Sequence, residues 1–345
     1  MRDVVVATMC ALLALAGCGG DGGGANDGGG IGDPTAKVAE VEYQGSEPAL
    51  FVQSGNGAGR RRIHFDGAAN PIAGNGADLE VRDDTILAMG PLRWSPDGRR
   101  LAVVVTLAFD QSEIVIVDED GGNATVASVD TQIILSRPDW SADGSKLVYA
   151  MSTLPAATGV DAFVTDLAAN TVNRLTEGAE LGGPGGELRF ASDGQAVLWS
   201  KATPTSDGPL DVPVSAIRQL ALGTGVVTDV AGGIPGEIQG IARSGNTAVV
   251  ARDVELDAGG RIVRSLATLT LAADGTVAKS VELAKGVVQY AVLLEGDARV
   301  LVVIDVSTDP ATPKIAYVTV PAAGGPGQLL GALGNAVVAA DVYRR

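Results

Sequence analysis

The side chains that could carry chemistry in this chain are mostly carboxylates. Asp and Glu number 41 against 25 Lys and Arg, which gives a formal net charge of −16, and His64 is the single histidine. One histidine excludes a multi-His zinc site and allows a Ser/His/Asp triad only through that residue. His64 follows an alternating strand pattern and precedes a turn, which indicates a structural histidine. The acidic balance argues against a nucleic-acid partner, because phosphate binding requires a surface rich in Lys and Arg.

Three oxygen-bearing side chains, Asp118, Asp120 and Asn123, lie close together in the sequence, as they do in calcium-binding loops. The spacing of an EF-hand and its distant Glu are missing, so a hairpin turn is the favoured interpretation. The chain also has no G-x-S-x-G segment, which excludes a nucleophile elbow. We therefore expect no catalytic residue, no metal site and no cofactor.

A second group of acids falls in the longer, irregular segments between apolar runs. Its members are Asp110, Asp207, Asp211, Asp253, Glu255, Asp257 and Asp309. They are hypothesised to form an acidic binding face for a basic protein segment or a cation. The alternative is that they are solvated loop charges that keep an acidic protein soluble. The basic run Arg60–Arg62 also has two interpretations, a solvated loop edge or a contact for anionic lipid.

The elements that would position these residues are β-strands. From residue 37 onward the chain consists of short runs rich in Val, Ile and Leu, bounded by Gly, Pro, Asp and Asn, which is typical of an all-β protein. Tight turns recur with glycines at Gly45, Gly98, Gly144, Gly194, Gly245 and Gly296, at separations of 53, 46, 50, 51 and 51 residues.

A second turn follows each of these glycine turns within the same repeat. The second turns are at 65–69, 118–123, 166–170, 221–225, 272–276 and 321–325. Each repeat therefore contains four strands and two tight turns, and six repeats fill residues 37–345. Four-stranded units of this length stack radially into a β-propeller.

Three of the repeats resemble a known family. The segments Trp94–Gly98 and Trp140–Gly144, which read W-S-P-D-G and W-S-A-D-G, resemble the WD40-like (PD40) repeat of TolB-type propellers, and a third copy follows at 188–199. The resemblance implies an all-β fold, a six-bladed β-propeller of four-stranded antiparallel blades. Five to seven blades are allowed, because the other three copies are inferred from spacing. The structural turn residues that it implies are Trp94, Pro96, Asp97, Gly98, Trp140, Asp143, Gly144, Phe190, Asp193 and Gly194.

The blade pattern also predicts where a binding face would be. With strands named a to d from the centre outward, the a–b and c–d turns lie on one face, and the b–c and d–a connections lie on the other. The first set is tight and the second set is long, so the second set would form the binding face. The aromatic residues of the turns are expected to pack between blades. Ring topology predicts that residues 336–343 join the first blade and close the ring.

The N-terminus resembles a bacterial lipoprotein signal. Its apolar run, Val4–Ala16, is too short to span a bilayer as a helix and leads into L-A-G-C, a lipobox-like sequence that ends at Cys18. The resemblance implies a signal peptide over 1–17, lipidation of Cys18, and anchoring in the outer membrane facing the periplasm. The alternative is an ordinary cleaved signal with an incidental cysteine. Residues 18–36 are rich in Gly and are expected to be a flexible tether before the propeller of 37–345.

These patterns together predict a non-enzymatic, monomeric, lipid-anchored propeller of the bacterial cell envelope. It would act as a scaffold that binds another envelope protein through its long b–c and d–a loops, without a nucleic-acid partner. The alternative is a propeller that binds a cation or small ligand, or is an enzyme, at an acidic channel mouth. A surface-adhesion lipoprotein is a third reading of the same sequence.

Overall fold

The computed structural model describes residues 35–343 with several gaps. The residues that lie outside the description are 1–34, 45–46, 70–71, 73–80, 109–110, 129–131, 154–159, 177–187, 204–212, 259, 295–297, 306–313, 326, 335–336 and 344–345. The predicted signal peptide, Cys18 and nearly all of the tether are therefore outside the described residues, and so are Asp110, Asp207, Asp211 and Asp309.

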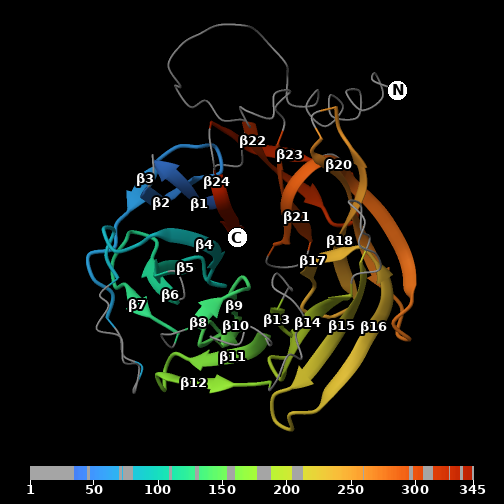
Figure 1. The fold of residues 1–345 in the computed structure, drawn as a ribbon, viewed down its shortest axis with the longest axis horizontal. Helices are drawn as coiled ribbons and strands as arrows, with labels where there is room; N and C mark the ends of the chain where they lie inside the picture. Colours follow the sequence, from blue (N-terminus) through green and yellow to red (C-terminus); the bar gives the residue numbers. More distant parts are fainter. Residues whose placement is uncertain are drawn as a thin grey trace, which may run out of the picture.

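All regular secondary structure in the described ranges is β-strand, and antiparallel sheets are arranged around a common centre (Figure 1). The first sheet has the order β24 (Val337–Tyr343), β1 (Lys37–Gln44), β2 (Glu47–Ser54), β3 (Arg61–Ile63). The second sheet has the order β4 (Ala88–Trp94), β5 (Arg100–Ala108), β6 (Gln111–Asp118), β7 (Thr125–Val126).

The next sheets continue around the centre in chain order. In the third sheet, β8 (Gln132–Ile134) and β9 (Asp139–Trp140) pair with β10 (Lys146–Thr153), followed by β11 (Val160–Asp166) and β12 (Thr171–Arg174). The fourth sheet has the order β13 (Leu188–Phe190), β14 (Ala196–Thr203), β15 (Val214–Ala221), β16 (Val227–Pro235). The remaining sheet, here called the long sheet, contains β17 (Glu237–Ile241), β18 (Thr247–Leu256), β19 (Ile262–Leu271), β20 (Val277–Leu293), β21 (Arg299–Asp305), β22 (Lys314–Pro321) and β23 (Gln328–Gly334).

The predicted glycine turns join the two innermost strands of a sheet through a repeated set of hydrogen bonds. Gly98 has a φ of 66° and donates its N–H to the Ser95 carbonyl at 2.8 Å. The Asp97 carboxylate accepts the N–H two residues later at 3.1 Å, and Asp143 and Asp193 do the same at 3.0 and 2.9 Å. Asp fixes the backbone, and Gly takes the positive φ that an L side chain disfavours. The local sequence therefore determines these turns.

The first repeat is offset by one strand from its prediction. The sequence predicts an a–b turn at Gly45, but residues 45–46 connect β1 and β2, the second and third strands of the first sheet. The turn predicted at 65–69 likewise comes after the outermost strand, β3, instead of before it. The innermost strand is β24, which pairs with β1 so that Lys37 lies opposite Tyr343. The predicted ring closure is thereby confirmed, and it causes the offset, because a ring closed by its last strand begins at its second strand.

The d–a connections are not uniformly long, contrary to the prediction. Residues 64–87 and 127–131 connect the first three sheets, but a single residue, Gly236, separates β16 from β17. Strand β20 runs for 17 residues without a turn and pairs with β19 along its first part and with β21 along its second part. The prediction of long d–a connections therefore fails in the C-terminal half, where strands continue from one repeat into the next.

The hydrophobic core lies between neighbouring sheets. Trp140 is fully buried and packs against Val104 and Ile116 of the second sheet, and Phe190 packs against Val148 of the third sheet. The repeated aromatic residues therefore fill the spaces between sheets, as predicted, where burial of a large side chain stabilises the fold by about 1.5–3 kcal/mol.

Contacts across the two chain ends reinforce the closure of the ring. Tyr343 packs on Trp94 with ring centroids 6.4 Å apart, and Lys37 Nζ donates to the Gly98 carbonyl at 2.9 Å. Lys37 also forms an ion pair with Glu119. The first and second sheets are thus held together by residues from the first and last strands of the ring.

Candidate binding site

A buried cluster of charged side chains joins several of the sheets. Its residues lie in or next to the innermost strands, which surround the centre of the ring in Figure 1. The Asp139 carboxylate is 2% exposed. Its oxygens lie 3.6 Å from Arg93 Nε, 3.7 Å from Arg189 Nε and 3.3 Å from Arg243 Nη1. The N–H of Phe190 donates a further hydrogen bond to it at 3.0 Å. One carboxylate therefore connects the second, third, fourth and long sheets.

Electrostatics keep Asp139 ionised. Burial alone would raise the pKa of this carboxyl, but the guanidinium groups of its arginine neighbours, Arg243 first, outweigh burial and hold the pKa below its ordinary value. A carboxylate with a lowered pKa is a poor general base at neutral pH. The cluster is therefore an ionic tie between sheets.

The same arrangement recurs where the ring closes. Asp341 of β24 is 3% exposed and accepts the N–H of Trp94 at 2.9 Å, as Asp139 accepts that of Phe190. In both places a carboxylate on an innermost strand binds the backbone of the aromatic residue on the next sheet. No motif in the sequence marks Asp139 or Asp341. Asp341 alone lies in an apolar strand, where a charged residue is unusual.

The predicted acidic face is only partly described. Three of its acids form ion pairs, namely Asp253–Arg264 at 3.0 Å, Glu255–Lys285 at 2.9 Å and Asp257–Arg261 at 2.7 Å. Each of these acids has a cationic neighbour on the long sheet, so their negative charge is balanced locally. Asp110, Asp207, Asp211 and Asp309 lie outside the described residues. An acidic face formed by all seven residues stays a prediction.

The other polar candidates from the sequence lie in local pairs. His64 Nδ1 is 2.7 Å from Asp83 Oδ2, and the other oxygen of Asp83 accepts the Phe65 N–H at 2.9 Å. This places His64 in a backbone-linked pair at the edge of the first sheet. In the ranges that the structure describes, no group of three His, Cys, Asp or Glu residues is placed to hold a metal ion.

The basic run beside His64 also contacts acids. Arg60 stacks on the Phe51 ring at 3.6 Å and reaches Glu40 and Glu42 at 3.1 and 2.8 Å. Glu40 is fully buried, and burial raises its pKa to about 7 despite the hydrogen bond from Arg60. Glu40 is thus a buried carboxyl that titrates near neutral pH.

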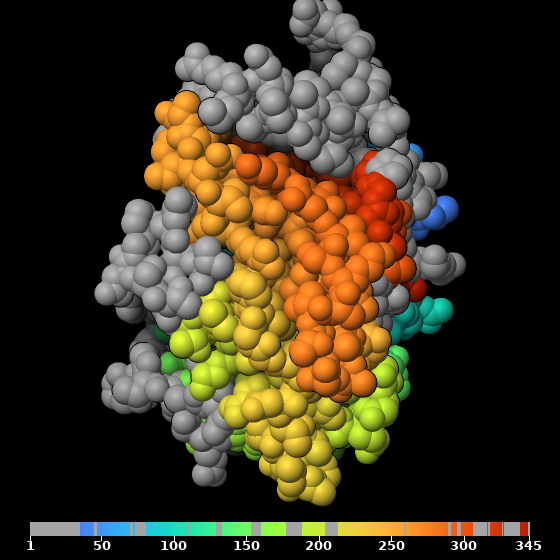
Figure 2. Space-filling model, turned by 90° about the vertical axis from the view of Figure 1, so that its right-hand side faces the viewer, coloured from blue at the N-terminus to red at the C-terminus, as the bar shows by residue number. Residues whose placement is uncertain are grey.

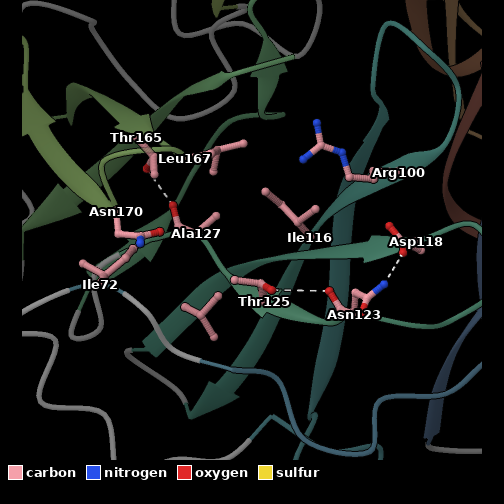
Figure 3. A pocket seen from close by; sticks show the side chains of 11 residues that line it. Ile72, Arg100, Ile116, Asp118, Asn123, Thr125, Ala127, Thr165, Leu167 and Asn170 are labelled. Atoms are coloured by element: carbon pink, nitrogen blue, oxygen red, sulfur yellow. Dashed lines mark hydrogen bonds between the residues drawn. The ribbon is translucent and has the colours of Figure 1, made fainter.

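A hollow of about 270 Å³ lies between the second and third sheets (Figure 3). Its apolar lining comes from Ile72, Ile116, Val126 and Leu167, and the polar lining includes Thr125 and Thr165. The Thr165 hydroxyl donates to the Ala127 carbonyl at 2.6 Å. The hollow therefore has an apolar floor on a framework fixed by hydrogen bonds.

Two asparagines stand on opposite sides of this hollow (Figure 3). Asn123 and Asn170 have φ values of 51° and 52°, and they are the non-glycine residues of positive φ in the described ranges. Both end the outer turn of their sheet, in the second and third repeats respectively. The Asn123 amide donates to Asp118 at 2.6 Å, whereas Asn170 is exposed.

A second hollow adjoins the first and is strongly polar. It has a volume of about 390 Å³ and shares Arg100 and Asp118 with the first hollow. The rest of its lining consists of Asp97, Arg99, Glu119 and Asp120. Four of its six lining residues are acids, so an apolar recess and an acidic recess lie side by side.

Comparison with solved structures assigns the architecture. TolB from Acinetobacter baumannii matches with a TM-score of 0.56 and 14% identity over 86% of this chain and 66% of that chain. The putative TolB from Agrobacterium tumefaciens matches with a TM-score of 0.50 and 11% identity over 90% and 98%. The fold is a TolB-like β-propeller. The chain spans about two-thirds of the length of the Acinetobacter protein.

Other comparisons add little beyond the propeller fold. A chain from a nidogen/laminin complex matches with a TM-score of 0.51 and 9% identity over 89% of this chain and 98% of that chain. No protein-family model matches the chain, and no curated protein matches its sequence. Identities this low establish the shape of the propeller and leave its activity open.

Both hollows lie on the face formed by the a–b and c–d turns, whereas the sequence predicts binding on the opposite face. The two hollows are lined by the c–d turns of the second and third sheets and, for the acidic hollow, by the a–b turn at Asp97. These are tight turns, whereas the sequence points to the long b–c and d–a connections. A usable signal was present, because D-E-D-G-G-N and D-L-A-A-N place Asn123 and Asn170 at the same point of successive repeats.

Proposed function

We propose that this propeller is a non-enzymatic protein-interaction scaffold of the bacterial cell envelope, anchored by lipid on Cys18. The observation that carries the proposal is a pair of recesses held on rigid, hydrogen-bonded sheets while the innermost charges are tied to one another around Asp139. A rigid framework that presents recesses at its surface suits recognition of a partner. One of the structures of similar shape is itself a complex between nidogen and laminin.

Six blades are part of this proposal. The first four sheets supply one blade each, and the long sheet supplies two when β20 is divided between its pairing with β19 and its pairing with β21. The glycine spacing in the sequence agrees with this division, because Gly245 lies in the turn between β17 and β18, and Gly296, outside the described residues, falls between β20 and β21 in the sequence.

Lipid anchoring rests on the sequence of the N-terminus. In the described ranges, no helix is long and apolar enough to cross a membrane. The test is to express the full chain and a Cys18→Ser variant and separate each by detergent phase partitioning. We expect the native chain in the detergent phase and the variant, if exported, in the aqueous phase. Equal partitioning of the two chains would contradict lipidation of Cys18.

The scaffold role is tested by capture of a partner from native envelopes. The full, anchored chain is crosslinked in place and isolated at low and at high salt. We expect a discrete protein partner that salt weakens, because recognition at acidic recesses depends on charge. A parallel capture with Asp253, Glu255 and Asp257 changed to the amides tests the long-loop face. Capture of no protein at either salt concentration would overturn the scaffold role.

A further inference from the structure

We propose that the paired hollows between the second and third sheets bind an extended protein segment that carries an apolar side chain next to a lysine or arginine. The apolar side chain occupies the smaller hollow, and the basic side chain reaches into the acidic hollow beside it. This inference rests on the proposed scaffold function and names the chemistry of the partner.

The size and lining of the smaller hollow suit one apolar side chain. Its volume of about 270 Å³ exceeds the roughly 150 Å³ of an apolar cavity that accepts benzene in another protein. Ile72 comes from the connection after the first sheet, Ile116 from the second sheet and Leu167 from the third. Since three separate segments line the recess, its shape depends on the folded ring.

The rim of the hollow presents groups that recognise peptide backbone. A side-chain amide both donates and accepts hydrogen bonds, as a peptide group does. Asn123 and Asn170 place two such amides on opposite sides of the recess (Figure 3). Their positive φ values fix both turns, so an extended segment lying between them meets amides that are already positioned.

The charges that line the acidic hollow select a basic side chain. Arg100 donates to the Gly144 carbonyl at 3.0 Å and stacks on Trp140 at 4.9 Å, so its guanidinium is turned toward the third sheet. Glu119 is paired with Lys37. The other lining residues are Asp97, Asp118 and Asp120 against Arg99, so the hollow is net acidic, in a chain of net charge −16. A basic side chain is therefore attracted, and an anionic lipid surface or a nucleic acid is repelled.

The test uses a defined probe, the tetrapeptide acetyl-Ser-Leu-Lys-Ser-amide, and a copy in which a diazirine analogue replaces leucine. The full anchored chain in detergent is irradiated with the diazirine peptide, and the crosslinked residues are mapped by mass spectrometry. Dissociation constants come from competition by the unmodified peptide. We expect crosslinks within 116–127 or 165–170, and at least tenfold weaker binding when Lys is replaced by Glu or Leu by Gly.

Two variants and one matched control locate the contacts. Asn170→Gly retains the positive φ and removes the amide, and Asp120→Asn removes one charge. Each is expected to weaken the peptide about fivefold, the equivalent of one hydrogen bond or ion contact. Asp274→Asn is the control, because Asp274 binds the N–H two residues later at 3.0 Å in a turn of the long sheet, as Asp120 does in the second sheet. It should leave affinity unchanged.

A further variant, Thr125→Trp, places a large side chain in the apolar hollow and should abolish crosslinking. If the tryptophan prevents folding, the Asn170→Gly variant still tests the inference. Crosslinks that map elsewhere, or equal affinity for the Lys and Glu peptides, would overturn the inference. The scaffold function is judged separately: a partner captured from envelopes equally well by Asn170→Gly and native chains supports a scaffold that uses another surface.

Discussion

The second and third sheets differ from the long sheet in what holds them together. The second and third sheets have short outer strands, β7 with two residues and β12 with four, and they contribute buried tryptophans and the Asp139–Arg93 pair of the central charge cluster. The long sheet has strands of ten residues in β18 and β19 and of 17 in β20. One region depends on side-chain contacts near the centre, and the other depends on continuous backbone pairing.

The two regions also differ in how many large hydrophobic side chains they expose. Figure 2 views the fourth and long sheets from outside, in yellow to orange. Among the described residues, the large hydrophobic side chains that are exposed include Val214, Val226, Val254, Leu256, Ile262 and Val277 in this part of the chain, against Leu87 elsewhere. Strands form equally well in the long sheet, where the repeat motif is weak. The motif residues are therefore needed for the side-chain contacts between sheets, and strand formation does not depend on them.

The largest expected effect comes from removing the strand that closes the ring. Deletion of residues 336–345 removes β24, exposes the edge of β1 and deletes the contacts of Asp341 and Tyr343 with Trp94. We expect thermal melting by circular dichroism to show a fall of more than about 10 °C or loss of the folded state. Deletion of residues 344–345 alone is the control. An unchanged melting temperature in the longer deletion would contradict closure by β24.

The ionic tie around Asp139 should be the next most sensitive feature. Asp139→Asn leaves the guanidiniums of Arg93, Arg189 and Arg243 without their shared carboxylate, so we expect a loss of about 3–5 kcal/mol in denaturant unfolding. The lowered pKa of Asp139 means that its stabilisation is present above the unfolded-state pKa and is lost as pH falls through the folded value. Asp253→Asn, at a partly buried ion pair away from the centre, should cost less than about 1 kcal/mol. Equal losses would remove the distinction between centre and periphery.

Glu40 should give the first sheet an opposite pH response. Its folded pKa of about 7 exceeds the ordinary value of 4.5, so its contribution is fully present below about pH 4.5 and is lost as pH rises through 7. Glu40→Gln should therefore stabilise the chain at pH 8 by up to about 3 kcal/mol and have little effect at pH 4.5. Unfolding curves at both pH values measure this, with Glu42→Gln as the control. A shift of the same size at both pH values would refute it.

Gly98 and Gly194 occupy the same position in the turns of two different repeats, and only Gly98 lies where the ring closes. Gly98 and Gly194 have φ values of 66° and 65°, but a Cβ at Gly98 would lie 2.2 Å from the Tyr343 ring, and one at Gly194 meets nothing within 4 Å. Gly194→Ala should cost about 1–2 kcal/mol from backbone conformation alone. Gly98→Ala should cost at least about 1 kcal/mol more. Denaturant unfolding of both variants provides the measurement, and equal costs would show that Tyr343 moves aside freely.

The smallest effect is expected on the exposed surface of the long sheet. Leu256 and Ile262 lie opposite each other at the end of β18 and β19 and are 48% and 37% exposed. Leu256→Ser should change the free energy of unfolding by less than about 0.5 kcal/mol. Leu266→Ser, at a fully buried position of the same hairpin, should cost several times as much and serves as the comparison. A large loss in Leu256→Ser would mean that this surface is covered.

Much of the fold follows from the sequence, because turn chemistry is local. Ser95, Asp97 and Gly98 determine their turn through contacts within a few residues, and the recurring glycine locates the turns at Gly144, Gly194 and Gly245 in three further repeats. The offset of the first repeat escapes such reasoning, since Gly45 reads as a turn whichever pair of strands it connects. The continuity of β20 escapes it too, because no turn residue marks a boundary there.

The candidate site is less accessible from the sequence for a different reason. The hollow brings Ile72 beside Asn170, nearly a hundred positions later. Asp139 and Arg243 likewise meet across 104 positions. Pairings of this kind depend on how sheets stack, and a single sequence carries no local trace of them. Local pattern identified Asn123 as a turn residue, and only the stacked sheets show that it faces a recess.

The pairing of β1 with β24 also determines when the first sheet can be completed during synthesis. A ribosome makes β1 first and β24 last, so the first sheet lacks its innermost strand for almost the whole period of synthesis. During that period β1 presents an open edge to which any extended segment can add. A cell that makes this protein must keep that edge unpaired until the final seven-residue strand arrives. Closure of the ring is therefore decided by β24.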